Sequence, residues 1–155
     1  MLGRILDALS KKKTLLDDAR QDALMMLVSG RRMFDLVLVA MKEEAGAHIR
    51  AKIGAMDKDL NRQQREVRRK VFEHLSLSSG QDLQQGLELI TAVIDLERIG
   101  DYTKNISELV EMMPDKLHFG EYEDTYHQVQ TLATQVFDRS VDAFAKSDVE
   151  SARLA

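Results

Sequence analysis

Apolar residues recur every three or four positions along most of this chain, a spacing that predicts long amphipathic helices. The pattern runs through four segments, residues 14–44, 47–77, 81–113 and 121–146. Gly46 marks the first break, a Ser-rich turn ending at Gly80 the second, and Pro114 the third, because proline blocks helix continuation. The first three segments, each about 30 residues long with short connections, favour an all-α fold, an antiparallel three-helix bundle.

The same spacing predicts which face of each helix is buried. In residues 14–44 this face comprises Leu16, Ala19, Ala23, Met26, Gly30, Met33, Val37 and Ala40. In residues 47–77 it comprises Ile49, Ile53, Met56, Leu60, Val67, Val71 and His74. In residues 81–113 a row formed by Leu83, Leu87, Ile90 and Ile94 continues into Glu97 and Asp101. In residues 121–146 the residues spaced as one helix face are Tyr126, Val129, Leu132, Val136, Ser140 and Phe144.

These segments divide the chain into three parts. Residues 1–13 form an amphipathic segment, residues 14–114 the three-helix bundle, and residues 121–155 a fourth helix followed by the start of another. Ser147 and Asp148 provide the cap for that last helix. The fourth helix covers one side of the bundle, begins a second bundle, or is exchanged between the subunits of a dimer.

Composition and charge narrow the functional classes. The net charge of −4 argues against a nucleic-acid-binding protein. The absence of cysteine excludes disulfides and thiolate metal sites. The apolar run 36–41 is far too short to cross a bilayer, and residues 1–13 carry their charges after the apolar part, the reverse of a secretory signal. These features are compatible with a cytoplasmic protein. We expect residues 1–13 to act as a docking or capping helix, or to contact an anionic membrane surface.

Two carboxylates continue the apolar row of residues 81–113. Glu97 and Asp101 lie four residues apart, so they share one helix face. Carboxylates on a core-facing row are costly unless they are paired, hydrogen-bonded or bound to a cation. Residues 47–77 offer a second polar row, Asp57, Asn61 and Gln64, which antiparallel packing places opposite the first.

This pattern leaves two interpretations of the acidic residues open. Oxygen ligands without histidine or cysteine suit hard cations such as Mg, Ca or Mn, or carboxylate-bridged iron. Alternatively, Glu97 and Asp101 form ion pairs with Arg98, Lys104 or a basic side chain of residues 47–77. The row on residues 47–77 is also compatible with an ordinary solvated helix edge.

A resemblance to a known family bears on this choice. The sequence Asp95-Leu-Glu-Arg-Ile-Gly-Asp101, followed by Asn105-Ile106, resembles the signature of the PhoU family of phosphate-uptake regulators. Residues 56–64 are similar to a second acidic motif of that family, and residues 140–148 to the start of its second repeat. The resemblance extends over residues 14–155. It implies two similar three-helix bundles, each with this motif pair on its second and third helices.

The resemblance also implies a function and a metal site. It implies a non-enzymatic regulator that restrains phosphate uptake and signalling through a phosphate transporter and a membrane sensor kinase. Contact with the membrane would then be peripheral, through these partners, and exchange of the fourth helix between subunits favours a homodimer. The implied metal ligands are Glu97, Asp101, Asp57 and Asn61, with Fe, Mn, Mg, Zn or Ca as the ion. Because Asn61 and Gln64 replace acidic residues common in relatives, we expect a weaker site.

Two other functions remain alternatives at this stage. One is a carboxylate-bridged metalloprotein or metalloenzyme on a helical bundle. Such sites usually carry Glu-x-x-His pairs, and residues 47–113 contain none. The other is a purely structural interaction bundle in which the acidic residues form ion pairs.

Overall fold

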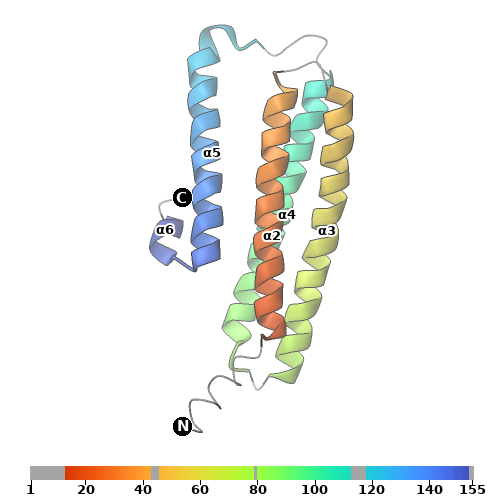
Figure 1. The fold of residues 1–155 in the computed structure, drawn as a ribbon, viewed down its shortest axis with the longest axis vertical. Helices are drawn as coiled ribbons and strands as arrows, with labels where there is room; N and C mark the ends of the chain where they lie inside the picture. Colours follow the sequence, from red (N-terminus) through yellow and green to blue (C-terminus); the bar gives the residue numbers. More distant parts are fainter. Residues whose placement is uncertain (1–12, 43–45, 79, 113–117, 154–155) are drawn as a thin grey trace.

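The computed structural model describes residues 13–42, 46–78, 80–112 and 118–153, and these residues contain helices and turns but no strand. The helices are α2 (Leu15–Ala40), α3 (Gly46–Leu77), α4 (Leu83–Met112), α5 (Glu123–Lys146) and α6 (Val149–Arg153), with a 3₁₀ turn, η1 (Gly120–Tyr122), before α5. The first three pack against one another in alternating directions, and α5 stands beside α2 (Figure 1). The predicted all-α three-helix bundle is confirmed.

Helix α2 begins and packs as its sequence predicts. Thr14 and Asp17 form a reciprocal cap, in which the Asp17 backbone N–H donates to Thr14 Oγ1 at 3.1 Å and the Thr14 N–H donates to Asp17 Oδ2 at 2.9 Å. All eight residues of its predicted face are buried. The helix ends at Ala40, so the predicted extension to residue 44 is too long or reaches beyond the described residues.

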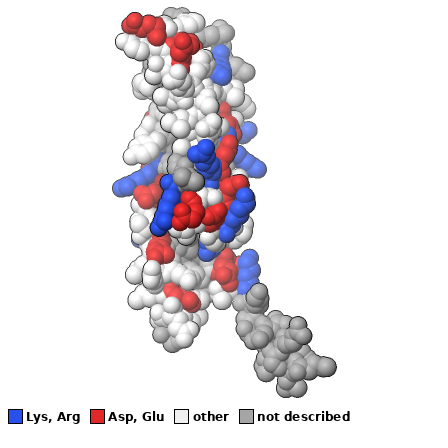
Figure 2. Space-filling view, turned by 90° about the vertical axis from the view of Figure 1, so that its left-hand side faces the viewer, with Lys and Arg blue, Asp and Glu red and all other residues white. Residues whose placement is uncertain are grey.

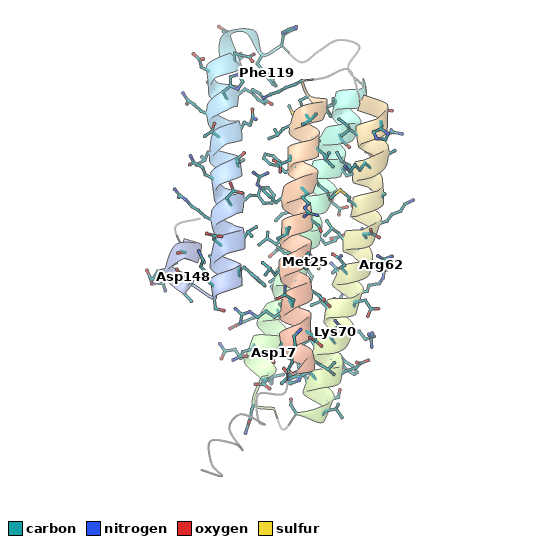
Figure 3. All side chains as sticks on the ribbon, viewed as in Figure 1. Asp17, Met25, Arg62, Lys70, Phe119 and Asp148 are labelled. Atoms are coloured by element: carbon teal, nitrogen blue, oxygen red, sulfur yellow. The ribbon has the colours of Figure 1, made fainter. Side chains whose placement is uncertain are left out.

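Helix α3 also follows its predicted pattern. Its residues Ile49, Ile53, Leu60, Val67 and Val71 are buried against α2 and α4. Met56 and His74, at the same spacing, are half-buried. Side chains from the three bundle helices fill the space between them (Figure 3). The core therefore lies along the axis of this bundle.

The predicted buried face of α4 is wrong by one residue. Leu83 and Leu87 are 51% and 53% exposed. The buried row consists of Gly86, Leu89, Val93, Leu96, Gly100, Thr103 and Ser107. One residue corresponds to about 100° of rotation around a helix. Small residues occupy much of this row because α4 packs closely on both α2 and α3. Glu97 and Asp101 consequently lie half-buried at its edge rather than in the core.

Helix α5 lies against α2 of the same chain. The Phe137 ring stacks on Phe34 with centroids 5.3 Å apart, and Arg31 Nε donates to Asp138 Oδ1 at 2.9 Å. On the molecular face that carries α5, acidic and basic side chains gather side by side in a central belt (Figure 2). Val129 and Leu132 are 60% and 61% exposed, so the apolar face of α5 is not buried along its whole length.

The end of α5 turns sharply into α6. Ser147 adopts a left-handed backbone conformation with φ of 56°, and Asp148 Oδ1 accepts from the N–H groups of Glu150 and Ser151, both at 3.1 Å. The predicted cap for a further helix is thus confirmed. Pro114 and residues 1–12 of the predicted amphipathic segment lie outside the described residues. Among the helices that the structure describes, none is both long enough and apolar enough to cross a bilayer.

Candidate functional site

Three carboxylates lie near one another where α3 meets α4. Asp57 comes from α3, and Glu97 and Asp101 come from α4; we refer to these three residues as the acidic cluster. Burial raises the pKa of Glu97, and the negative charges of Asp101 and Asp57 raise it further. The predicted pairing of the two polar rows therefore places Asp57 near Glu97 and Asp101.

The close approach of the two helices depends on Gly100. A Cβ atom at this position would lie 2.5 Å from Leu60 Cδ1 of α3 and 3.8 Å from Met33 Cε of α2. Leu60 is 1% exposed and lies one turn beyond Asp57 on α3. The glycine thus allows α4 to rest directly on Leu60. Gly100 therefore serves close packing, and it brings Glu97 and Asp101 near the Asp57 side of α3.

Asp57 is the most buried member of the acidic cluster. The residue is 6% exposed. Its Oδ2 atom lies 3.5 Å from Lys104 Nζ, whereas its Oδ1 atom is buried without a hydrogen-bond donor among the described residues. Buried carboxylate oxygens normally have a partner. This oxygen is therefore free to accept a ligand or a water molecule.

The two ion pairs considered from the sequence have different outcomes. Lys104 pairs with Asp57 rather than with a carboxylate of its own helix. Arg98 pairs with Asp95 at 3.3 Å, and both side chains are largely exposed. Asn61 is half-buried and donates its Nδ2 hydrogen to the Asp57 backbone oxygen at 3.2 Å. Its amide nitrogen is thus held by α3 itself.

The donor set determines which ligands the acidic cluster suits. Within the described residues, no three or more histidine, aspartate or glutamate side chains are already arranged to hold a metal ion. A cation would therefore have to draw the three carboxylates closer together. By donor type the residues fit a hard divalent cation, because they offer carboxylate oxygens, one of them unsatisfied. Such an ion would also relieve the repulsion that raises the pKa of Glu97.

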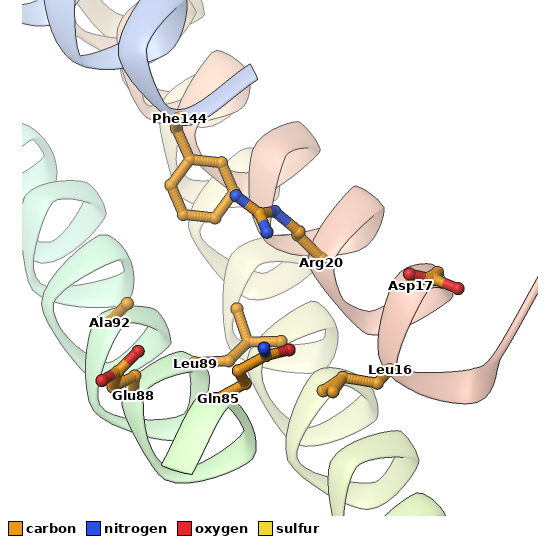
Figure 4. A pocket seen from close by; sticks show the side chains of 8 residues that line it. All are labelled: Leu16, Asp17, Arg20, Gln85, Glu88, Leu89, Ala92 and Phe144. Carbon is orange, nitrogen blue, oxygen red and sulfur yellow. The ribbon is translucent and has the colours of Figure 1, made fainter. Parts of the chain in front are cut away.

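A groove near the other end of the bundle was not foreseen from the sequence. It encloses about 220 Å³ between α2 and α4, below the end of α5 (Figure 4). The Arg20 guanidinium lies 5.8 Å from the centroid of the Phe144 ring, and Arg20 Nη2 donates to Ser147 Oγ at 2.6 Å. Arg20 thus links the end of α5 to α2, so this groove lies at the contact between the helices.

Comparison with known proteins identifies one related family. The family model of the PhoU domain matches residues 24–110. The match covers more than half of the chain and contains every residue of the acidic cluster. No match is found among curated proteins or among solved structures.

Proposed function

Since this chain belongs to the PhoU domain family, we propose that it regulates phosphate uptake and phosphate signalling through contacts with a phosphate transporter and a membrane sensor kinase. The observation that carries this proposal is the family match over residues 24–110, which covers most of the bundle and the whole acidic cluster. In this proposal the chain acts on the cytoplasmic side of the membrane, as a homodimer and without catalysing a reaction. Light scattering of the purified protein tests the dimer, which a monomeric mass would contradict.

The proposal includes a cation in the acidic cluster. Glu97, Asp101 and Asp57 supply the carboxylate ligands, and Asn61 lies one turn beyond Asp57 on α3. The unsatisfied Asp57 oxygen and the mutual repulsion of the carboxylates support this assignment. The cation would contribute positive charge between α3 and α4, so its binding would tie the two helices together. Mn, Mg, Ca, Zn and Fe remain the candidate ions.

Phosphate uptake in living cells tests the regulatory function. A host that lacks its own PhoU-family regulator is supplied with the wild-type chain, and phosphate uptake and a phosphate-starvation reporter are measured in phosphate-rich medium. We expect the chain to lower both signals. The double variant Glu97→Ala plus Asp101→Ala should lower them less, whereas Asp95→Ala should act like wild type, because Asp95 is an exposed acid of the same helix. Unchanged uptake and reporter signals with the wild-type chain would contradict the proposal.

Elemental analysis tests the cation separately. Protein purified without chelator is analysed for metal content as wild type, as the Glu97→Ala plus Asp101→Ala variant, and as Asp95→Ala. We expect metal in wild type and in Asp95→Ala, and its loss from the double variant. Metal that persists in the double variant would place the site elsewhere.

A further inference from the structure

Lys104 provides the positive charge nearest to the buried end of the acidic cluster. Its Nζ atom reaches across from α4 to lie 3.5 Å from Asp57 Oδ2. The Lys104 side chain is 37% exposed, whereas the Asp57 side chain is only 9% exposed. By comparison, the acidic side chain is 36% exposed in the pair of Lys70 with Asp22 and 38% exposed in the pair of Arg50 with Glu111. Lys104 thus serves an unusually buried carboxylate.

This ion pair is incomplete in its geometry. A close charge-assisted hydrogen bond has a length of about 2.7–2.9 Å, so a 3.5 Å separation leaves the ammonium short of full contact. The second Asp57 oxygen has no donor among the described residues. A lysine side chain is flexible and strongly hydrated, and this one already reaches solvent. Lys104 can therefore withdraw from Asp57 without rearrangement of the bundle.

A divalent cation in the acidic cluster would need the same carboxylate. Two positive charges beside Asp57 would repel each other, because both would lie within a few ångströms of its oxygens. We propose that Lys104 is the built-in counter-ion of Asp57 and that it sets the cation affinity of the acidic cluster, because a cation binds fully only when the ammonium withdraws. This inference rests on the proposed cation site and adds the residue that controls its affinity.

Neutral substitution of Lys104 tests this role. Manganese(II) alone is titrated into wild type, Lys104→Met, Lys104→Gln and Lys104→Arg, and free manganese is measured by electron paramagnetic resonance. We expect both neutral variants to bind manganese about tenfold more tightly than wild type, since they remove a unit charge next to the site. Lys104→Arg retains the charge and should bind within about threefold of wild type. Lys104→Gln serves as the second neutral variant if Lys104→Met fails to fold.

Thermal unfolding provides a readout that does not depend on metal. In EDTA, Lys104→Met should have a lower Tm than wild type, because Asp57 loses its counter-ion, and manganese should raise the Tm of the variant more than that of wild type. Lys70→Met is the matched control. Lys70 pairs with Asp22 across α2 and α3, and its side chain is 24% exposed. This control should lose stability in EDTA without any change in manganese affinity.

The possible results separate this inference from the proposed function. Tighter manganese binding by both neutral variants supports the role of Lys104. If wild type itself binds no manganese in that experiment, the role of Lys104 still stands, but the proposal that the wild-type chain holds a cation is contradicted. Unchanged or weaker binding by both folded neutral variants overturns the role of Lys104. The cation site would stand even then if wild type contains metal and the Glu97→Ala plus Asp101→Ala variant does not. The cellular uptake assay tests the regulatory function independently of both.

Discussion

Substitution of Gly100 by alanine tests whether close packing at one position holds α3 and α4 together. The new Cβ would lie 2.5 Å from Leu60 Cδ1, a distance at which something must move. Leu60 is 1% exposed and cannot turn into solvent without opening the core. The substitution should therefore push the two helices apart at the acidic cluster.

The expected magnitude follows from two opposing effects. Alanine in a helix interior is more favourable than glycine by about 0.8–1.0 kcal/mol. Overpacking of a well-filled core costs about 1–3 kcal/mol. Gly100→Ala should therefore lower the free energy of unfolding by roughly 0–2 kcal/mol. Gly54 is the matched control, because a Cβ there meets nothing within 4 Å. Gly54→Ala should raise stability by about 0.8–1.0 kcal/mol.

Urea unfolding followed by far-UV circular dichroism measures both variants in EDTA. The gap between them should be about 1–3 kcal/mol, with similar m-values. Leu60→Val removes the atom that opposes the new methyl group. The double variant Gly100→Ala plus Leu60→Val should therefore lose less stability than the two single variants lose together. Equal stabilisation by Gly100→Ala and Gly54→Ala would refute the argument that Gly100 is required for close packing.

Three further predictions concern different parts of the molecule. Because the pKa of Glu97 is raised in the folded chain, its ionisation costs stability as pH rises above the ordinary value of 4.5. In EDTA at neutral pH, Glu97→Gln should therefore have a higher free energy of unfolding than wild type, by less than about 1 kcal/mol. This gain should vanish at lower pH, and urea unfolding at several pH values measures it. Thr14→Ala removes the cap of α2 and should lower the free energy of unfolding by about 1 kcal/mol in the same assay. Phe137→Ala removes the ring that stacks on Phe34, so limited proteolysis should cut within α5 faster while the bundle stays intact.

Each of these predictions has its own control. For Glu97→Gln, a stability gain that grows toward low pH would reverse the assigned sign. Thr131→Ala is the control for the cap, since Thr131 is exposed within α5. An equal loss of stability in both variants would show that Thr14 has no special role as a cap. For Phe137→Ala, the exposed Val129→Ala is the control. Equal cleavage of α5 in these two variants would show that the ring stack does not hold it.

The helices were predictable because their apolar spacing is regular. In α2 every residue of the predicted face is buried, since a single row of apolar residues faces its neighbours. In α4 the prediction followed the large residues Leu83 and Leu87, whereas the buried row includes Gly86 and Gly100. Close contact between helices selects small side chains, and a search for large apolar residues misses them.

The residues of the acidic cluster were predictable from the sequence, but which of them is most buried was not. The sequence placed Glu97 and Asp101 in the core and Asp57 at a weaker second row. The structure reverses this order, since Asp57 is buried and the other two lie half-buried at the edge. The burial of Asp57 depends on how α4 is rotated about its own axis. The periodicity of a single sequence does not determine this rotation to within one residue. The pairing of Lys104 with Asp57 depends on the same rotation.

The order of contacts along the chain has a consequence for how the protein folds. Helices α2, α3 and α4 pack on one another, whereas α5, the fourth long helix, packs on α2, the first helix of the bundle. Contacts between neighbouring segments form quickly, and those that close long loops form more slowly. We expect the bundle to assemble during synthesis, before α5 has emerged from the ribosome. The acidic cluster needs no residue of α5, so a nascent chain would hold it complete.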